Sequence, residues 1–292
     1  MWSRWYGTIV EKVRGWADSD PAVRAVLIVG SQARTIVPAD AYSDLDLVIF
    51  HEIPDRLIDS TDWVHQFGTV LLTTVEKTAV LDSRERRVLY ADGRDVDFSV
   101  FPTAALMLVR GSPEALSVLS RGVEVLVDKD QQLTSLTEPR SGPAGASDHG
   151  LGEEEFQSAV ADFWYHVLWA AKKLRRGELW TAKQAIDGYL KSLLVQMVGW
   201  QAILRRGRSV DVWHAGRLLE RWAEPETLAR LPATFAGYGD RDLLRALGET
   251  GRLYSDLARE VAEAKGWSYP VAAERAVRAL TEAVLEISPS SG

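Results

Sequence analysis

Apolar residues in the first half of the chain fall in short runs and alternations typical of strands. Residues 26–29 form an apolar run that ends on Gly30, which predicts a buried strand that stops at a tight turn. Helices are expected over residues 5–16 and 102–116, and a short helix or a loop over 54–59. The other predicted strands are residues 44–50, 70–75, 88–91, 96–101 and 123–127. A hairpin signal at Asp92-Gly93 joins the third and fourth of these. This half is therefore predicted to be a mixed sheet with helices on at least one side.

The second half of the chain shows the apolar period of amphipathic helices. Long helices are predicted at residues 156–176, 179–207, 240–266 and 270–287. Between the halves, residues 139–152 are rich in glycine and proline, which is typical of a linker. The sequence therefore predicts an α+β chain, with a sheet domain over residues 1–138 and an all-helical bundle over residues 153–292.

Composition narrows the class of protein. The chain has 292 residues, 46% of them hydrophobic and 26% charged, as in a soluble globular protein of two domains. Its net charge of −7 argues against a nucleic-acid substrate and suits a cationic or small neutral one. It contains no cysteine, so disulfides and thiolate chemistry are excluded. Without a signal peptide or a membrane-spanning run in the sequence, we expect a cytoplasmic monomer with no nucleic-acid or membrane partner.

A glycine turn and two carboxylates stand close together in the sequence. Period-2 alternation places Asp44 and Asp46 on one face of a strand and their apolar neighbours on the other. Two such carboxylates at a strand's start can share divalent metal ions. Upstream, Ser31 follows Gly30 and opens a short predicted helix, where a hydroxyl and free backbone N–H groups can hold a phosphate. Each signal alone is common, but their combination favours nucleotidyl transfer.

This chemistry requires a third carboxylate, as general base or as a further metal ligand. Asp95, Asp97 and Ser99 share one face of the strand that follows the hairpin turn. We select Asp97 because it lies deeper in the strand. Asp95 is closer to the turn, where a solvated turn residue is an equally good interpretation.

The Gly30-Ser31 pair followed by Asp44-x-Asp46 resembles the hallmark of the DNA polymerase β-like nucleotidyltransferase superfamily. The likeness to one family of it, the aminoglycoside (streptomycin) 6-adenylyltransferases, covers nearly the whole chain. It is clearest in residues 62–68, 127–130, 162–164, 173–183 and 197–200. The resemblance implies a nucleotidyltransferase domain, followed by a helical substrate-binding domain that covers the cleft.

The resemblance also implies an activity and its residues. The reaction would be transfer of AMP from ATP to a hydroxyl of streptomycin, with Mg²⁺ as cofactor and two ions expected. Asp44, Asp46 and Asp97 would hold metal, and Asp97 would also act as general base. The nucleotide would contact Gly30 and Ser31.

Other charged residues are candidate contacts for the two substrates. Arg34 and Lys183 could reach the nucleotide, although a surface arginine is nearly as good an interpretation of Arg34. Asp162, Glu178 and Asp187 are candidate partners for the guanidinium or ammonium groups of the acceptor. Each of these carboxylates is also consistent with a solvated charge on a helix.

Two alternative functions remain open from the sequence. One is a nucleotidyltransferase that acts on a protein or RNA, as in toxin–antitoxin relatives, but the acidic net charge does not favour it. The other is a catalytically silent nucleotide-binding protein, and the presence of all three carboxylates argues against it.

Overall fold

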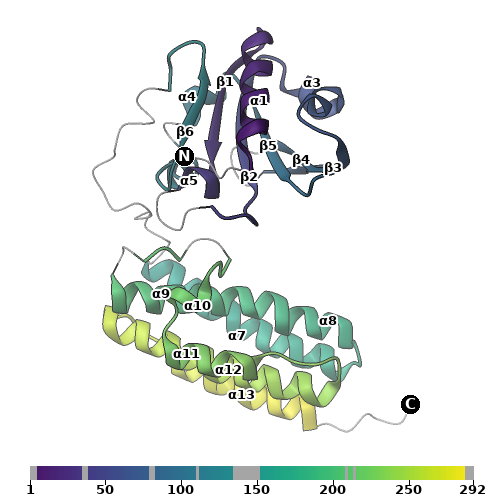
Figure 1. Cartoon of the computed structure of the whole chain (residues 1–292). Helices are drawn as coiled ribbons and strands as arrows, with labels where there is room; N and C mark the ends of the chain where they lie inside the picture. Colours follow the sequence, from purple (N-terminus) through teal and green to yellow (C-terminus); the bar gives the residue numbers. More distant parts are fainter. Residues whose placement is uncertain are drawn as a thin grey trace. The chain divides into compact units, whose positions relative to one another are not determined.

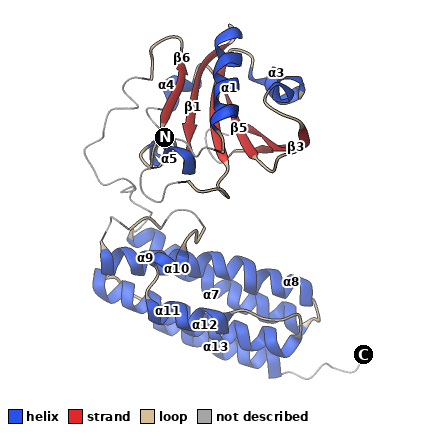
Figure 2. Cartoon of the chain, viewed as in Figure 1, coloured by secondary structure: helices blue, strands red, loops and turns tan. Residues whose placement is uncertain are grey.

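The computed structural model describes residues 5–34, 39–78, 83–109, 112–133, 152–207, 210–212 and 215–286. The chain divides into two compact units, residues 1–147 and residues 148–292, which are described separately below (Figures 1 and 2). The linker predicted at residues 139–152 lies outside the described residues, apart from Gly152, which caps the first helix of the second unit.

The first unit is built on a six-stranded sheet. Its strands are β1 (Val23–Val29), β2 (Leu45–His51), β3 (Val70–Lys77), β4 (Arg84–Tyr90), β5 (Asp95–Pro102) and β6 (Glu124–Asp128). They lie in the order β3-β4-β5-β2-β1-β6. Only β2 and β5 pair in parallel, and the other neighbours are antiparallel. The mixed sheet predicted from the apolar pattern is thus confirmed.

One face of this sheet is covered by α1 (Gly7–Ser19), α3 (Pro54–Asp59) and a 3₁₀ helix, η1 (Asp62–Gln66) (Figure 1). The odd-numbered apolar residues of β2 and the even-numbered residues of β5 face this core, as their alternation predicts. The Trp63 ring stacks on Trp16, with ring centroids 5.0 Å apart, and meets Phe98 edge-on at 4.8 Å. Burying these large rings stabilises this side of the sheet.

The opposite face is divided between an apolar and a polar part. Phe50 and Phe101 pack with α4 (Ala105–Val109) and α5 (Pro113–Leu119) in a second, smaller core. Asp46 and Asp97, on the same strands as these two rings, lie on the polar part of this face. The short helix α2 (Gly30–Ala33) connects the end of β1 to the segment that leads into β2. The strands thus place carboxylates directly beside an apolar surface.

The second unit is helical, as predicted. Its elements are α7 (Glu153–Arg175), α8 (Leu179–Gln184), the π-helical turn η2 (Ala185–Tyr189), α9 (Leu190–Arg206), α10 (Leu219–Trp222), α11 (Pro225–Arg230), the 3₁₀ turn η3 (Leu231–Thr234), α12 (Asp240–Lys265) and α13 (Val271–Glu286). Helix α7 packs against α9, α12 and α13 (Figure 1). At the centre, the Phe163 ring stacks on that of Tyr254.

Several details differ from the sequence prediction. The strand expected over residues 88–91 begins four residues earlier, at Arg84. The helix expected over residues 102–116 is two short helices, because Ser112 caps a new helix that begins at Pro113. The helix expected from residue 179 onward contains the π turn η2, which apolar spacing does not reveal. The short helices α10 and α11 were not predicted, because each is too short to show a period.

Candidate active site

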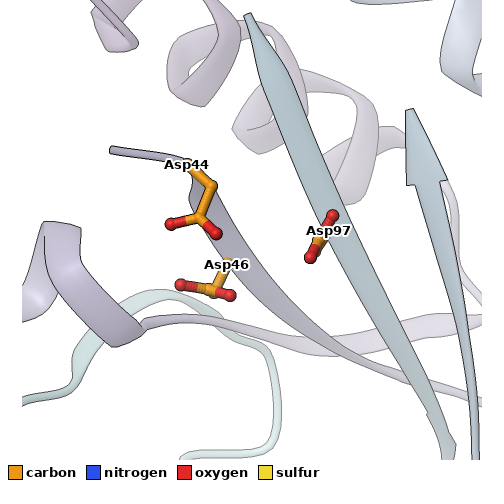
Figure 3. A group of neighbouring side chains, drawn as sticks. All are labelled: Asp44, Asp46 and Asp97. Carbon is orange, nitrogen blue, oxygen red and sulfur yellow. The ribbon is translucent and has the colours of Figure 1, made fainter. Parts of the chain in front are cut away.

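Three carboxylates meet at one end of the parallel strand pair. Asp46 lies opposite Asp97 in the register of β2 and β5, and Asp44 lies just before β2. Each residue offers one carboxylate oxygen, and these oxygens all lie within 4.8 Å of one another (Figure 3). The structure therefore brings together the three aspartates that the sequence singles out. Oxygen ligands at this spacing suit a hard divalent cation.

The glycine turn lies directly against this group. Val29, the last residue of β1, pairs with Asp46, so the chain turns at Gly30 beside the Asp46 carboxylate. Gly30 has a φ of +65°, a conformation that favours glycine. The next two side chains are buried and donate to the Asp44 carbonyl oxygen, from Ser31 Oγ at 3.4 Å and from Gln32 Nε2 at 3.1 Å. These bonds hold the backbone that presents Asp44.

Ser31 and Gln32 thus have a role that the sequence analysis did not assign. The Ser31 hydroxyl is buried and donates to the Asp44 carbonyl oxygen, so it is engaged within the protein. Its expected contact with a phosphate stays a prediction. Gln32 was missed entirely, since a glutamine beside a Gly-Ser turn carries no signal in one sequence.

The three carboxylates repel one another in a half-buried setting. Burial, followed by the charges of Asp44 and Asp97, raises the pKa of Asp46 to about 7, while Arg34 acts in the opposite direction. Burial, followed by the charge of Glu85, raises the pKa of Asp97 to about 7. A bound cation would relieve this repulsion, so the donor set and its electrostatics both fit a metal site. The position of Arg34 near Asp46 agrees with its proposed contact to a phosphate.

A second group of polar residues borders Asp97 and was missed by the sequence analysis. Arg87 lies opposite Asp97 in the register of β4 and β5, and its Nε atom is 3.3 Å from Asp97 Oδ2. It also contacts Glu76 and, at 3.0 Å, Glu85. Ser99 donates a hydrogen bond of 2.6 Å to Glu85. The hairpin turn could have revealed these residues, because its register pairs Arg87 with Asp97 and Glu85 with Ser99.

A pocket of about 460 Å³ opens on the same face of the sheet. Its polar wall includes Asp46, Glu85 and Arg87, and its apolar wall is formed by the smaller core. The apolar wall comprises Leu27, Val29, Val48, Phe50, Phe101, Val109, Ala115, Val118 and Leu119. Such a combination of apolar lining and a few charged groups is typical of a small-molecule site.

The remaining predicted site residues lie in the helical unit, and two of the carboxylates are paired with cations. Glu178 is held by Lys173 at 2.8 Å and by Arg176 at 2.5 Å. Asp187, on the π turn, is 2.6 Å from Lys183 and 3.7 Å from the buried Lys191. These contacts give both carboxylates a structural role.

Lys183 and Asp162 are engaged differently. Lys183 also donates to the backbone carbonyl of Ala236 at 2.6 Å, so a nucleotide would have to compete for it. Asp162 accepts a hydrogen bond of 2.6 Å from the Tyr189 hydroxyl and lies 2.7 Å from Nδ1 of His166. The ring centroids of His166 and Tyr189 are 4.4 Å apart. Asp162 is thus surrounded by aromatic groups.

Comparison with known proteins identifies the family. A model of the streptomycin adenylyltransferase family matches residues 4–284. The chain belongs to this family. It is therefore an enzyme of the nucleotidyltransferase class, and the resemblance found in the sequence is confirmed.

Individual relatives of the chain are distant but cover most of its length. It is similar to proteins named aminoglycoside 6-adenylyltransferase from Bacillus subtilis (20% identity, covering 87% of this chain and 89% of the relative) and from Campylobacter jejuni (20% identity, 91% of both chains). A third, from Staphylococcus aureus, is 21% identical over 90% of this chain and 92% of its own. A crystal structure of an aminoglycoside 6-adenyltransferase from Bacillus subtilis aligns over 96% of this chain and 97% of its own, with 16% identity and a TM-score of 0.47.

No helix among the described residues is both long and apolar enough to cross a membrane.

Proposed function

We propose that this enzyme transfers AMP from ATP to a hydroxyl group of an aminoglycoside, with streptomycin as the expected acceptor. The proposal rests on one observation: the carboxylates of Asp44, Asp46 and Asp97 lie close together in a member of the streptomycin adenylyltransferase family. The names of the relatives support an aminoglycoside acceptor. The acidic net charge of −7 supports a cationic acceptor as well.

The proposed metal is Mg²⁺, with two ions expected. Asp44 and Asp46 would hold it, with Asp97 as a further ligand, because their oxygens lie close enough to share one ion. When bound, Mg²⁺ would neutralise phosphate charge and stabilise the leaving pyrophosphate. The side chains must be ionised to bind it, so a bound ion would lower the raised pKa values of Asp46 and Asp97.

The remaining roles follow from position. The triphosphate is proposed to lie over the Gly30-Ser31 turn, with Arg34 nearby as a positive charge. Asp97 is proposed to accept the proton of the acceptor hydroxyl, because its carboxylate lies at the metal-binding end of the strand pair and would be ionised once the metal is bound. Asp162 is the proposed acceptor contact in the helical unit, because an aromatic and acidic surface suits a cationic polyol.

The proposal is tested by incubating the protein with ATP, Mg²⁺ and a panel of aminoglycosides, followed by mass spectrometry. We expect streptomycin to gain the mass of one AMP, and the Asp46→Asn variant to produce none. Modification of an added RNA or protein instead would favour the first alternative function. ATP binding without turnover on any acceptor would favour a silent binding protein.

A further inference from the structure

The Arg87 guanidinium is held by carboxylates at the edge of the proposed active site. It contacts Glu76, lies 3.0 Å from Glu85, and lies 3.3 Å from Asp97. These residues come from the neighbouring strands β3, β4 and β5, where Glu76 pairs with Glu85 and Arg87 pairs with Asp97. Arg87 therefore faces three carboxylates, which together carry more negative charge than it neutralises, and Lys77 is a second cation that lines the same pocket.

Glu85 is held in place, whereas the cation is accessible. The side chain of Glu85 is 15% exposed and accepts a hydrogen bond of 2.6 Å from Ser99. The Arg87 side chain is 52% exposed. An exposed ion pair contributes little stability, so Arg87 can be displaced at modest cost. The Glu85 carboxylate would stay in place, because it is half-buried on the sheet and accepts the hydrogen bond from Ser99.

Three members of this group also line the pocket that Asp46 lines. Glu76, Glu85 and Arg87 are on its polar wall together with Asp46. Glu85 pairs with Ser99, and Ser99 is two residues from Asp97 on the same face of β5. The Glu85–Ser99 pair and the Arg87–Asp97 pair are therefore about 7 Å apart along the strands. A guanidinium and a hydroxyl carried on one six-membered ring can span this separation.

We propose that Glu85 and Glu76 select the acceptor by binding one of its guanidinium groups at the position that Arg87 occupies. This inference rests on the proposed function, since streptomycin carries two guanidinium groups on a ring that also bears hydroxyls. A guanidinium makes paired hydrogen bonds to carboxylates, and Arg87 shows that this planar group fits between them. Arg87 turns outward on binding, and the acceptor hydroxyl lies beside Asp97.

The first test measures streptomycin binding by titration calorimetry without ATP or metal. Arg87→Met removes the competing guanidinium and should tighten binding about tenfold, the effect of one charge-assisted hydrogen bond. Glu85→Gln should weaken binding about tenfold. In the double variant Glu85→Gln/Arg87→Met, the increase in streptomycin affinity that follows from removing Arg87 should disappear.

Arg84→Met is the matched control. Arg84 is on the same strand and contacts two carboxylates, Asp55 and Asp59, but these belong to α3 on the other face of the sheet. Its replacement should leave streptomycin binding unchanged. Because Arg87→Met leaves three carboxylates facing one another, Arg87→Lys serves as a second variant. It keeps the charge but lacks the planar fork, so its streptomycin affinity should lie between wild type and Arg87→Met.

A different role for Arg87 would give a different pattern. If Arg87 only orients Asp97, Arg87→Met would lower kcat, leave the dissociation constant of streptomycin unchanged, and be rescued by Arg87→Lys. That result, or weaker binding by Arg87→Met, would overturn the proposal.

Methylguanidine separates this proposal from the proposed function. If no aminoglycoside is adenylylated, the proposed function fails, but the carboxylate site can still be measured with this probe. Arg87→Met should bind methylguanidine more tightly than wild type, and the double variant should lose that gain. Equal binding by all three proteins would contradict the guanidinium site itself, whatever the acceptor is.

Discussion

A Cβ atom placed on Gly30 would lie 1.8 Å from Oδ2 of Asp46. The turn after β1 therefore lies so close to the carboxylate on β2 that there is no room for a side chain at position 30. Two independent features favour glycine at position 30. One is the close approach of Asp46, and the other is the φ of +65°, which disfavours any residue with a Cβ. This contact couples the conformation of the turn to the position of the proposed metal ligand.

Gly30→Ala should abolish AMP transfer and weaken metal binding, because the new methyl group must displace Asp46. The positive φ should add a loss of stability of about 1–2 kcal/mol. Gly93→Ala is a matched control, since Gly93 has a φ of +85° but open space around its Cβ position. We expect similar destabilisation in both variants, measured by chemical denaturation, and normal turnover only in Gly93→Ala. Normal turnover in Gly30→Ala would show that Asp46 need not keep its position.

Asp44→Asn and Asp46→Asn should each abolish turnover while leaving the fold intact. An amide keeps the shape of the side chain but loses the charge that binds a divalent ion. Binding of Mn²⁺, followed by electron paramagnetic resonance, should weaken in both variants, and circular dichroism should be unchanged. Near-wild-type turnover in either variant would remove that residue from the metal site.

In the metal-free protein, Asp46 and Asp97 should contribute less stability as pH rises from about 4 to above 7. Asp46 and Asp97 have pKa values raised to about 7, so the folded state holds these protons more tightly than the unfolded chain does. Their contribution is therefore favourable at low pH and is lost as pH rises through 7. Melting temperatures in EDTA should fall more steeply in wild type than in Asp46→Asn, and Mg²⁺ should reduce that difference. Parallel curves for the two proteins would contradict the raised pKa of Asp46.

Asp97→Asn should lower turnover by about 10²–10⁴-fold, the usual contribution of a positioned base. Its effect on ATP affinity should be smaller than that of the Asp44 or Asp46 variants. Asp95→Asn is the control: Asp95 is exposed and accepts a hydrogen bond from the Tyr6 hydroxyl, so its replacement should be mild. Steady-state kinetics with streptomycin would compare the two, and an essential Asp95 with a dispensable Asp97 would reverse the assignment.

In the helical unit, Asp187→Asn should affect stability and Asp162→Asn should affect the acceptor. Asp187 is the anionic partner of Lys183 and of the buried Lys191, whose pKa burial lowers to about 8. Losing it should cost about 1–3 kcal/mol in the free energy of unfolding. Asp162→Asn should instead raise the KM for streptomycin with little change in stability. Denaturation and kinetics on both variants would test this division, and an unchanged KM in Asp162→Asn would exclude that contact.

Local patterns in the sequence were sufficient for the strands of the sheet, for the long helices and for the first two carboxylates. Alternation assigns Asp44 and Asp46 to one face because successive side chains of a strand point to opposite sides. The long helices α7, α12 and α13 were predicted because their apolar residues recur at helical spacing. The ion pairs of Asp187 could also have been predicted from the sequence, since Lys183 and Lys191 lie four residues before and after it on a helical segment.

Apart from the β4–β5 hairpin, which the signal at Asp92-Gly93 predicts, tertiary structure decided which strands are neighbours. The parallel pairing of β2 with β5 places Asp97 opposite Asp46, although they are distant in the chain. The position of β4 and β3 beyond β5 then brings Arg87, Glu85 and Glu76 to the same face. Periodicity within a strand says which way its side chains point, but not which strand lies beside it. That choice depends on how all the apolar faces are buried together, so the approach of Asp46 and of Glu76 to the groups around Asp97 was visible only in the folded sheet.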